Sequence, residues 1–442
     1  MPKIANRILI AVLVGLVILG CGAVGVSATG AFSPASGSLD PESYVVPPPT
    51  PRTPEPGLGT PDAAISPNSA QIQAGLAALS RRGLGTVSYM VTDVSGNTVA
   101  AEDGTTARVP ASSWKILTAT AVLSAYGPDH RFTTTVVSSP TGIVLVGGGD
   151  PYLTRSSAAP AGQGTIQDLA AQTAQSLSKS GLTSVILGYD DSLFAGPQWN
   201  PIWPDDFGAD VEPISALSVD PNGYANANTS ADAAGIFKSL LADQGISVTA
   251  VRSEKAAPDA KQVASVDSQP LGQIVQRILG ASYNFGAEVL LRHVSVAAGG
   301  NGSPTSAASA LTDFLKAQGL WASGMSVSDG SGLSDGNKVP PSILAQVVRT
   351  AYGNPLLADV LMGMPVAGVD GTLSRRFDDP DEAGARGVVH AKTGTLDYVR
   401  TLTGFAQTSS GAVVFFSFML NNLPDDAAGL DWLDEAASVL AS

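Results

Sequence analysis

Apolar and polar positions between residues 70 and 131 predict a helix, a β-hairpin and a second helix, in that order. Apolar side chains over 72–79 recur at the three- to four-residue spacing of a helix face. The runs 86–92 and 98–101 favour strands, and Ser95-Gly96-Asn97 between them is typical of a hairpin turn. A run of helix-forming apolar residues then follows Ser112. The pattern indicates that this part mixes helix with antiparallel sheet.

Between 132 and 270 the pattern changes to short β runs that alternate with loops, helical stretches and glycine-rich turns. The runs 143–146 and 185–187 are clear strand candidates. Gly147-Gly148-Gly149 follows the first of them, but no Gly-Lys-Ser/Thr comes after it, which favours a turn over a phosphate-binding loop. We therefore predict that 132–270 form a separate domain inserted into the domain that precedes it.

From residue 271 onward, helical stretches are followed by strands in hairpin order. The predicted helices are 271–279, an apolar helix through 291, one beginning near 341 and an amphipathic one over 426–440; the predicted strands are 388–391, 399–406 and 412–420. The first and last helices can cover the faces of such a sheet. We therefore predict an α/β fold of the α+β type, in which 70–131 and 271–442 form an antiparallel sheet flanked by helices, with a large inserted domain.

Residues 1–28 have the layout of an export segment. Two basic residues precede an uncharged apolar run over 8–26, and Val26-Ser27-Ala28 fits a small-residue cleavage site. The run is also long enough to be an uncleaved membrane anchor, and lipidation at Cys21 is a third, less well matched interpretation. Residues 29–69 are rich in Pro, Ser, Gly and Thr, which favours a disordered linker. We expect an extracytoplasmic protein, either secreted or tethered to the membrane by this segment.

The composition narrows the chemistry further. The 24 basic and 38 acidic side chains leave a net charge of −14, which argues against a nucleic-acid partner. The single cysteine lies in the N-terminal apolar run, so a disulfide within the chain is excluded. The three histidines, His130, His293 and His390, lack metal-ligand spacing, and we expect no metal site.

Ser112 and Lys115 are the strongest candidates for chemistry. Three residues apart on a helix, their side chains lie on one face, one turn apart. A neutral lysine can take the proton from a serine hydroxyl, and a helix start favours the negative charge that then develops. Two further short motifs follow in order: Ser282-x-Asn284 and Lys392-Thr393-Gly394.

Each motif is weak when taken separately, because the chain contains decoys. Ser176 and Lys179 repeat the first spacing in a polar helical stretch. Ser66-Pro67-Asn68 and Ser95-Gly96-Asn97 repeat the second, in the linker and in a hairpin turn. The order and the setting of the three motifs together therefore carry the assignment, because a triplet of this kind is typical of enzymes that use a serine nucleophile.

The resemblance extends beyond the triplet to essentially the whole chain from about residue 75 to the C-terminus. The matching stretches are VPASSWKILTATAVL, LVGGGDPYLT, SQPLGQIVQRILGASYNFGAEVLLR, SDGSGLS, PVAGVDGTL and HAKTGTLDYVRTLTGFA. Together they resemble the class C low-molecular-mass penicillin-binding proteins, which are serine D-alanyl-D-alanine carboxypeptidases/endopeptidases of the S13 peptidase family. Ser112 and Ser282 are 170 positions apart, room for an insert that a compact β-lactamase lacks. The resemblance implies a transpeptidase fold of the penicillin-binding-protein/β-lactamase type.

The resemblance also implies roles for the first two motifs. Ser112 would attack the carbonyl between two terminal D-alanines of a peptidoglycan stem peptide, and Lys115 would be its general base. Ser282 would relay a proton to the leaving amine, and Asn284 would orient Lys115 and the substrate amide. Tyr283 stands where the family usually has Asp, and we expect it to point away from the chemistry.

For the third motif, the resemblance implies substrate binding. Lys392 and Thr393 would hold the C-terminal carboxylate, and Gly394 would let the substrate lie against the strand edge. The backbone N–H groups of Ser112 and Thr395 would form the oxyanion hole. We expect no cofactor, and acylation by β-lactam antibiotics. Two alternatives remain open: a β-lactamase, and a non-enzymatic penicillin-binding scaffold or sensor of the cell wall.

Two smaller features have alternative interpretations. Asp329 and Ser331 border the cleft or serve only a turn, with equal support. Trp199 and Trp203 favour packing in a core or between domains over stacking on a sugar ring.

Overall fold

The computed structural model describes residues 65–221 and 228–442 of the chain. The predicted export segment at 1–28 and most of the predicted linker at 29–69 lie outside these residues. Among the residues that are described, no helix combines the length and the apolar character needed to cross a membrane.

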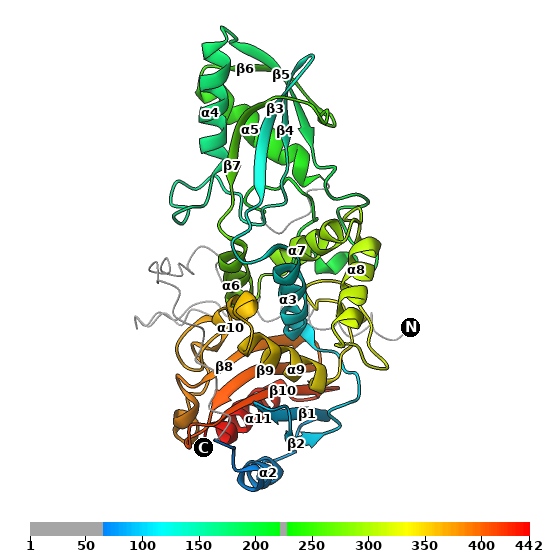
Figure 1. Cartoon of the computed structure of the whole chain (residues 1–442), viewed down its shortest axis with the longest axis vertical. Coiled ribbons are helices and arrows are strands. Elements are labelled where there is room, and N and C mark those ends of the chain that lie inside the picture. The colour runs from blue at the N-terminus through cyan, green and yellow to red at the C-terminus, as the bar shows by residue number, and fades with distance from the viewer. Residues whose placement is uncertain (1–64, 222–227) are drawn as a thin grey trace, which may run out of the picture. The chain divides into compact units, whose positions relative to one another are not determined.

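The first sheet contains five antiparallel strands in the order β2-β1-β10-β9-β8 (Figure 1). Its strands are β1 (Thr86–Asp93), β2 (Thr98–Glu102), β8 (Val389–Leu396), β9 (Val399–Gln407) and β10 (Val413–Asn421). Along its whole length β1 pairs with β10, so the sheet joins segments from both ends of the described chain. In this order β8 is an edge strand.

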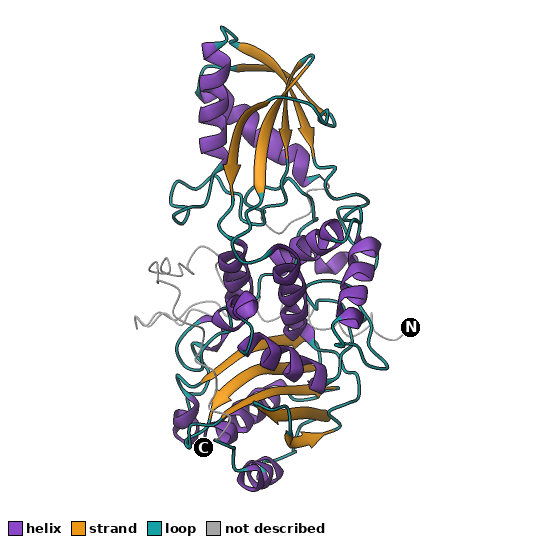
Figure 2. Ribbon diagram, viewed as in Figure 1, coloured by secondary structure: helices purple, strands orange, loops and turns teal. Residues whose placement is uncertain are grey.

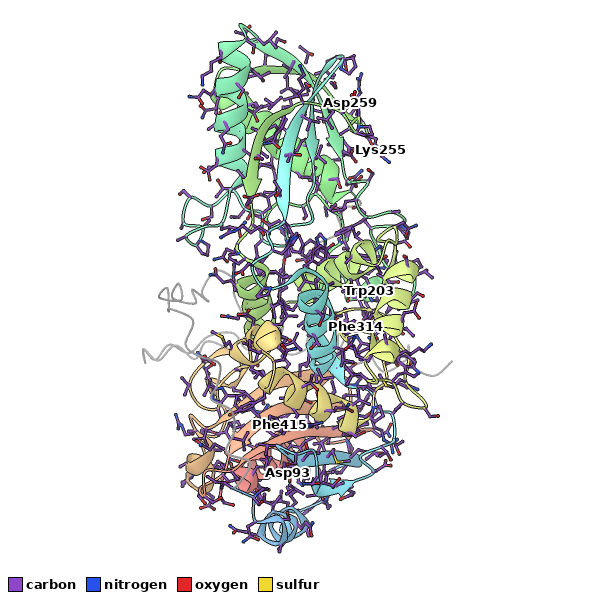
Figure 3. All side chains as sticks on the ribbon, viewed as in Figure 1. Asp93, Trp203, Lys255, Asp259, Phe314 and Phe415 are labelled. Atoms are coloured by element: carbon purple, nitrogen blue, oxygen red, sulfur yellow. The ribbon has the colours of Figure 1, made fainter. Side chains whose placement is uncertain are left out.

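Alternate side chains of the first sheet enter two hydrophobic cores. On β10, Phe416 packs in the core that includes α2 (Ser69–Ala78) and α11 (Asp426–Ala441), whereas Phe415 packs in the other core. The helices of that other core are α3 (Lys115–Tyr126), α6 (Leu271–Ala281), α7 (Asn284–Ala297), α8 (Pro304–Ala317), α9 (Pro341–Tyr352) and α10 (Ala358–Met362). Figure 3 labels Phe415 together with Phe314, which packs against the same core from α8. Period-two alternation thus buries both faces of the sheet.

A second sheet forms within residues 133–267, which we call the second unit (Figure 2). Its elements are β3 (Thr133–Ser139), β4 (Gly142–Val146), α4 (Ile166–Lys179), β5 (Ser184–Asp190), α5 (Thr229–Asp243), β6 (Ser247–Ser253) and β7 (Gln262–Asp267). The strand order is β6-β5-β4-β3-β7; β4, β5 and β6 run parallel, and β3 is antiparallel to β4 and β7. Apolar side chains of α4 and α5 pack against the sheet in a separate core.

Short 3₁₀ turns complete the described chain. They are η1 (Ala111–Trp114), η2 (Asp205–Ala209), η3 (Pro355–Leu357), η4 (Gly371–Leu373) and η5 (Pro380–Ala385). Two of them, η1 and η4, position side chains of the candidate site.

The predicted fold class is confirmed, but some of its elements differ from the prediction. The pattern missed α8, whose first half is rich in alanine and serine; the helix begins at Pro304 after Ser303, whose hydroxyl accepts the Ser306 N–H. The predicted strand at 388–391 is also too short. Because β8 continues to Leu396, the Lys392-Thr393-Gly394 motif lies within an edge strand and not after it.

Candidate active site

Ser112 lies in the 3₁₀ turn η1, which runs directly into α3, and not in the α-helix itself. A 3₁₀ turn has three residues per turn, so side chains three apart eclipse one another, and Lys115 Nζ lies 2.7 Å from Ser112 Oγ. The turn begins with a strained residue, Ala111, at φ 47°. Its carbonyl closely approaches Gly332, where a Cβ would collide with it. The tight turn, and not an ideal helix face, therefore brings the serine and the lysine together.

Lys115 is buried, and its Nζ has three partners. They are Ser112 Oγ at 2.7 Å, Asn284 Oδ1 at 2.6 Å and the Ser331 carbonyl at 2.8 Å. A neutral amine has two hydrogens and one lone pair. When the two carbonyl oxygens accept the hydrogens, the lone pair is left to accept the proton of Ser112. The geometry thus suits a general base.

The electrostatic setting supports the neutral form of Lys115. Burial lowers the pKa of Lys115 to about 7, against the opposing influence of the nearby carboxylates of Asp329 and Glu288. A substantial fraction of the amine is therefore neutral near pH 7, whereas an exposed lysine would be almost entirely protonated.

Glu288 places the carbonyl that holds Lys115. Its Oε1 accepts the backbone N–H groups of Gly330 at 2.9 Å and Ser331 at 2.7 Å, which turns the Ser331 carbonyl toward Lys115 Nζ. None of the three sequence motifs includes this residue. Its signal is present, because Glu288 is one helical turn after Asn284 in an otherwise apolar part of α7. Burial raises the pKa of Glu288 to about 7, and the carboxylate of Asp329 adds to the shift.

Asp329 organises the same loop from the inside. Its carboxylate accepts the backbone N–H groups of Gly332 at 2.9 Å and Ser334 at 2.7 Å, and the Trp203 Nε1–H at 3.1 Å. The residue is fully buried, so the turn interpretation is right and the carboxylate does not border a cleft. Trp203 belongs to the second unit and packs in one core with Phe285 of α7, which agrees with the predicted packing in a core or between domains.

The middle motif connects α6 to α7. Ser282 ends α6 in the left-handed conformation at φ 58°, and its Oγ accepts a hydrogen bond from Lys392 Nζ at 2.9 Å. Asn284 begins α7; its Oδ1 accepts from Lys115, and its Nδ2 donates to the Asp210 carbonyl at 2.9 Å. Asp210 belongs to the second unit, so that unit orients the amide. No pattern in the sequence indicated this contact.

The Tyr283 ring packs against aromatic side chains. Its centroid lies 5.5 Å from the Tyr152 ring and 5.8 Å from the Phe285 ring. The Arg277 guanidinium lies over the Tyr152 ring, 3.6 Å from its centroid. Because Tyr152 comes from the second unit, Tyr283 links that unit to the Ser282 turn. This packing agrees with the expectation that the middle residue points away from the chemistry.

Lys392 is buried on β8 and faces the same network. Its Nζ donates to Ser282 Oγ at 2.9 Å and to the Thr393 carbonyl at 2.8 Å. Burial, and then the charge of Lys115, hold the pKa of Lys392 well below its usual range. The two lysines therefore oppose each other's protonation. An incoming anion would favour the charged form of Lys392.

Gly394 has a structural reason of its own, beside the predicted role toward the substrate, which stays a prediction. A Cβ at this position would collide with Thr401 Oγ1 and lie 2.7 Å from the Pro110 carbonyl. Pro110 directly precedes η1, and Thr401 on β9 is hydrogen-bonded to it. The absence of a side chain at Gly394 therefore lets β8 approach the turn that bears Ser112. The contact is fixed by Thr401 Oγ1, which donates to the Pro110 carbonyl at 2.8 Å and is 2.8 Å from Ser113 Oγ.

The outer edge of β8 carries the Thr395 N–H. At the start of the strand, the Ala391 N–H donates to the Pro365 carbonyl, and the Val389 carbonyl accepts from the Ala367 N–H. The backbone N–H and C=O groups of odd-numbered residues of β8 therefore point away from β9. The β8–β9 register continues unbroken to Leu396. Alternation therefore turns the Thr393 and Thr395 amides to the same edge. This direction is the one that an oxyanion-hole donor at Thr395 requires.

Taken together, the fold and the site define a class. An antiparallel sheet flanked by helices, a serine–lysine pair at the first helix after the hairpin and a second lysine on the edge strand are the arrangement of penicillin-interacting serine enzymes. The chain belongs to the D-Ala-D-Ala carboxypeptidase 3 (S13) family of serine peptidases, whose model matches residues 70–227 and 221–442. The family predicted from the sequence is confirmed.

Relatives and solved structures agree with this membership. The chain is 34% identical over 375 residues to a carboxypeptidase of Mycobacterium tuberculosis, with 80% of this chain and 81% of the relative covered. It is also 34% identical over 392 residues to the carboxypeptidase DacB of Mycolicibacterium smegmatis, with 83% and 82% covered. The crystal structure of penicillin binding protein 4 from Haemophilus influenzae superposes with a TM-score of 0.69 at 20% identity, covering 84% of this chain and 98% of that one. The last similarity supports the fold.

Proposed function

We propose that this protein is a serine D-alanyl-D-alanine carboxypeptidase that removes the terminal D-alanine from peptidoglycan stem peptides through an acyl-enzyme on Ser112. The observation that carries the proposal is the enclosure of Lys115, whose Nζ lies 2.7 Å from Ser112 Oγ and is held by Asn284 and Ser331. Membership of the S13 family supports D-Ala-D-Ala as the substrate class, and the two relatives support carboxypeptidase activity.

The proposed acylation uses the first two motifs. Ser112 Oγ attacks the carbonyl carbon of the penultimate D-alanine while Lys115 Nζ takes the hydroxyl proton. The N–H groups of Ser112 and Thr395 stabilise the oxyanion, a contribution typically worth about 10²–10³ in rate for each donor. The C–N bond then breaks, a proton passes through Ser282 Oγ to the leaving amine, and D-alanine departs. Water hydrolyses the remaining ester and regenerates Ser112.

The third motif would bind the C-terminal carboxylate. Lys392 Nζ supplies a positive charge, and Thr393 supplies a hydroxyl on the exposed side of β8. Lys392 also lies 2.9 Å from Ser282 Oγ, which supports a proton relay near the leaving group. Because two carboxylate oxygens accept hydrogen bonds and donate none, a cation and a hydroxyl are suitable partners.

The domain layout and location follow the same proposal. We place the catalytic domain at 70–131 and 271–442, and the inserted domain at 132–270, which contains the second sheet and contributes the Asp210 carbonyl and Trp203. A substrate in the cell wall requires an extracytoplasmic enzyme. We propose export through residues 1–28, with secretion and membrane tethering as the two outcomes that fractionation of cells would separate.

One experiment tests the function. One sample of the full chain is incubated with a β-lactam, and the adduct is located by mass spectrometry. D-alanine release from a pentapeptide is measured on a separate, untreated sample. A Ser112 adduct together with D-alanine release supports the proposal. Fast release of hydrolysed antibiotic would identify a β-lactamase, and a lasting adduct without D-alanine release would identify a sensor. An adduct that persists in Ser112→Ala would overturn the assignment of the nucleophile.

A further inference from the structure

We propose that Thr372 is a positioning residue for the carboxylate site: its hydroxyl donates to Thr393 Oγ1, which leaves the Thr393 proton for the C-terminal carboxylate of the substrate. The inference rests on the proposed function, because it assigns that carboxylate to Thr393. The two hydroxyl oxygens lie 2.8 Å apart. Thr372 is 21 positions before Thr393, in the PVAGVDGTL stretch but outside the three short motifs.

The turn that bears Thr372 is held firmly on both sides. It forms η4, and a Cβ on its first residue, Gly371, would lie 2.9 Å from the Gly280 carbonyl near the end of α6. Asp370 Oδ1 accepts the Val366 N–H at 2.7 Å, and the Leu373 side chain is fully buried. The Thr372 hydroxyl is therefore presented from a fixed backbone, although the side chain itself is exposed.

The position of this turn along β8 also matters. The preceding segment pairs with the outer edge of β8 only at its beginning, where Val366 bridges to His390 and Ala367 donates to Val389. From Thr393 onward the outward amides of β8 face the edge on which the proposed substrate lies. Thr372 thus lies between the segment of the chain that pairs with the beginning of β8 and the part of the β8 edge proposed to bind substrate.

Proton counting gives the contact a direction. Each threonine hydroxyl has one proton and two lone pairs, whereas a carboxylate only accepts. If Thr393 donated to Thr372, it would have no proton for the substrate. With substrate bound, Thr393 donates to the carboxylate and Thr372 donates to Thr393, and a chain of hydroxyls aligned in this way strengthens each bond in it. Lys392 Nζ, bonded to the Thr393 carbonyl at 2.8 Å, anchors the same residue through its backbone.

The test removes the hydroxyl and keeps the shape. In Thr372→Val we expect KM for a peptide ending in D-Ala-D-Ala to rise about fivefold with kcat within twofold, the effect of losing one neutral hydrogen bond. A peptide whose terminal carboxylate is replaced by an amide should be processed equally by both proteins. Thr372→Ser should restore KM. Thr350→Val, at an exposed threonine of α9 that donates to its own helix, is the matched control.

Two outcomes would overturn the proposal. An equal loss on the acid and the amide would indicate a structural defect, and unchanged KM on both would show that the hydroxyl is not used. In Thr393→Val, the further change Thr372→Val should add nothing. The role of Thr372 can also be tested if the proposed function is wrong. If the wild-type chain released no D-alanine, the acylation rates of a penicillin and its methyl ester would supply the same acid-to-neutral ratio.

Discussion

The chain contains two serine–lysine pairs with the same spacing, and their surroundings differ completely. Ser112 and Lys115 span η1 and the start of α3, where the lysine is buried and its Nζ lies 2.7 Å from the serine oxygen. Ser176 and Lys179 lie on α4 of the second unit, where Ser176 Oγ donates to the Val263 carbonyl at 3.1 Å. Lys179 is exposed at the end of that helix, where its charge stabilises the helix dipole.

The difference shows that spacing provides proximity but not chemistry. The base at Lys115 depends on removal of water and on two carbonyl acceptors, Asn284 Oδ1 and the Ser331 carbonyl, which come from distant parts of the chain. Lys179 is exposed at the end of α4 and lacks such an enclosure. Variants made in parallel at the two pairs can therefore separate motif from setting.

The largest difference is expected for the serines. Ser112→Ala removes the nucleophile, and D-alanine release should fall by at least about 10⁴-fold, since little more than binding and the oxyanion hole would remain. Ser176→Ala should keep full activity and full labelling by a fluorescent penicillin. Labelling of Ser112→Ala, or its loss in Ser176→Ala, would reverse the assignment of the two pairs.

Substitution of the two lysines should give a smaller difference in the rate of acylation. Lys115→Met keeps the length of the side chain but removes the base, and acylation should slow by about 10³-fold, within the range for loss of a general base. Lys179→Met should be neutral in the same stopped-flow assay of acylation. Comparable rates in the two variants would mean that Lys115 does not take the proton.

The sequence alone predicts the parts of this comparison that depend on local pattern. Period-two alternation indicates the hairpin strands of the first sheet, and the turn before an apolar helix distinguishes Ser112 from Ser176. The spacing of Glu288 from Asn284 on an apolar helix marks the residue, but its role was not predictable, because it acts through backbone groups of a loop 42 positions away. The same holds for the Asp210 carbonyl, which is 74 positions from Asn284 and has no side-chain signature.

A further contrast concerns buried threonine hydroxyls. Thr401 Oγ1 ties β9 to the Pro110 carbonyl and to Ser113, whereas Thr173 Oγ1 donates to the Leu169 carbonyl within α4. Thr401→Val removes one hydrogen-bond partner from the Pro110 carbonyl and one from Ser113 Oγ in the nucleophile turn, and acylation should slow by about tenfold. Thr173→Val removes an equally buried hydroxyl without that effect. Equal acylation rates, at matched thermal unfolding temperatures, would show that this tie does not position Ser112.

The smallest expected effect concerns the pH dependence of kcat/KM that results from the burial of Lys115. Lys115 must be neutral to act, and its pKa of about 7 places the acid limb of kcat/KM there: activity falls as the pH decreases below about 7 and is retained above it. The negative charge of Glu288 raises the pKa of Lys115. Glu288→Gln removes that charge, while the amide oxygen can still accept the Gly330 and Ser331 N–H groups. The acid limb should therefore move to lower pH.

The expected size of this last shift is small, because burial raises the pKa of Glu288 itself to about 7 and the group is already partly neutral on the acid limb. At pH 6, Glu288→Gln should acylate about two- to threefold faster than the wild type, with equal rates at pH 8. Glu382→Gln is the matched control, since burial likewise raises the pKa of Glu382 to about 7 within η5. A limb that moved to higher pH, or moved equally in the control, would mean that Glu288 does not act on Lys115 through its charge.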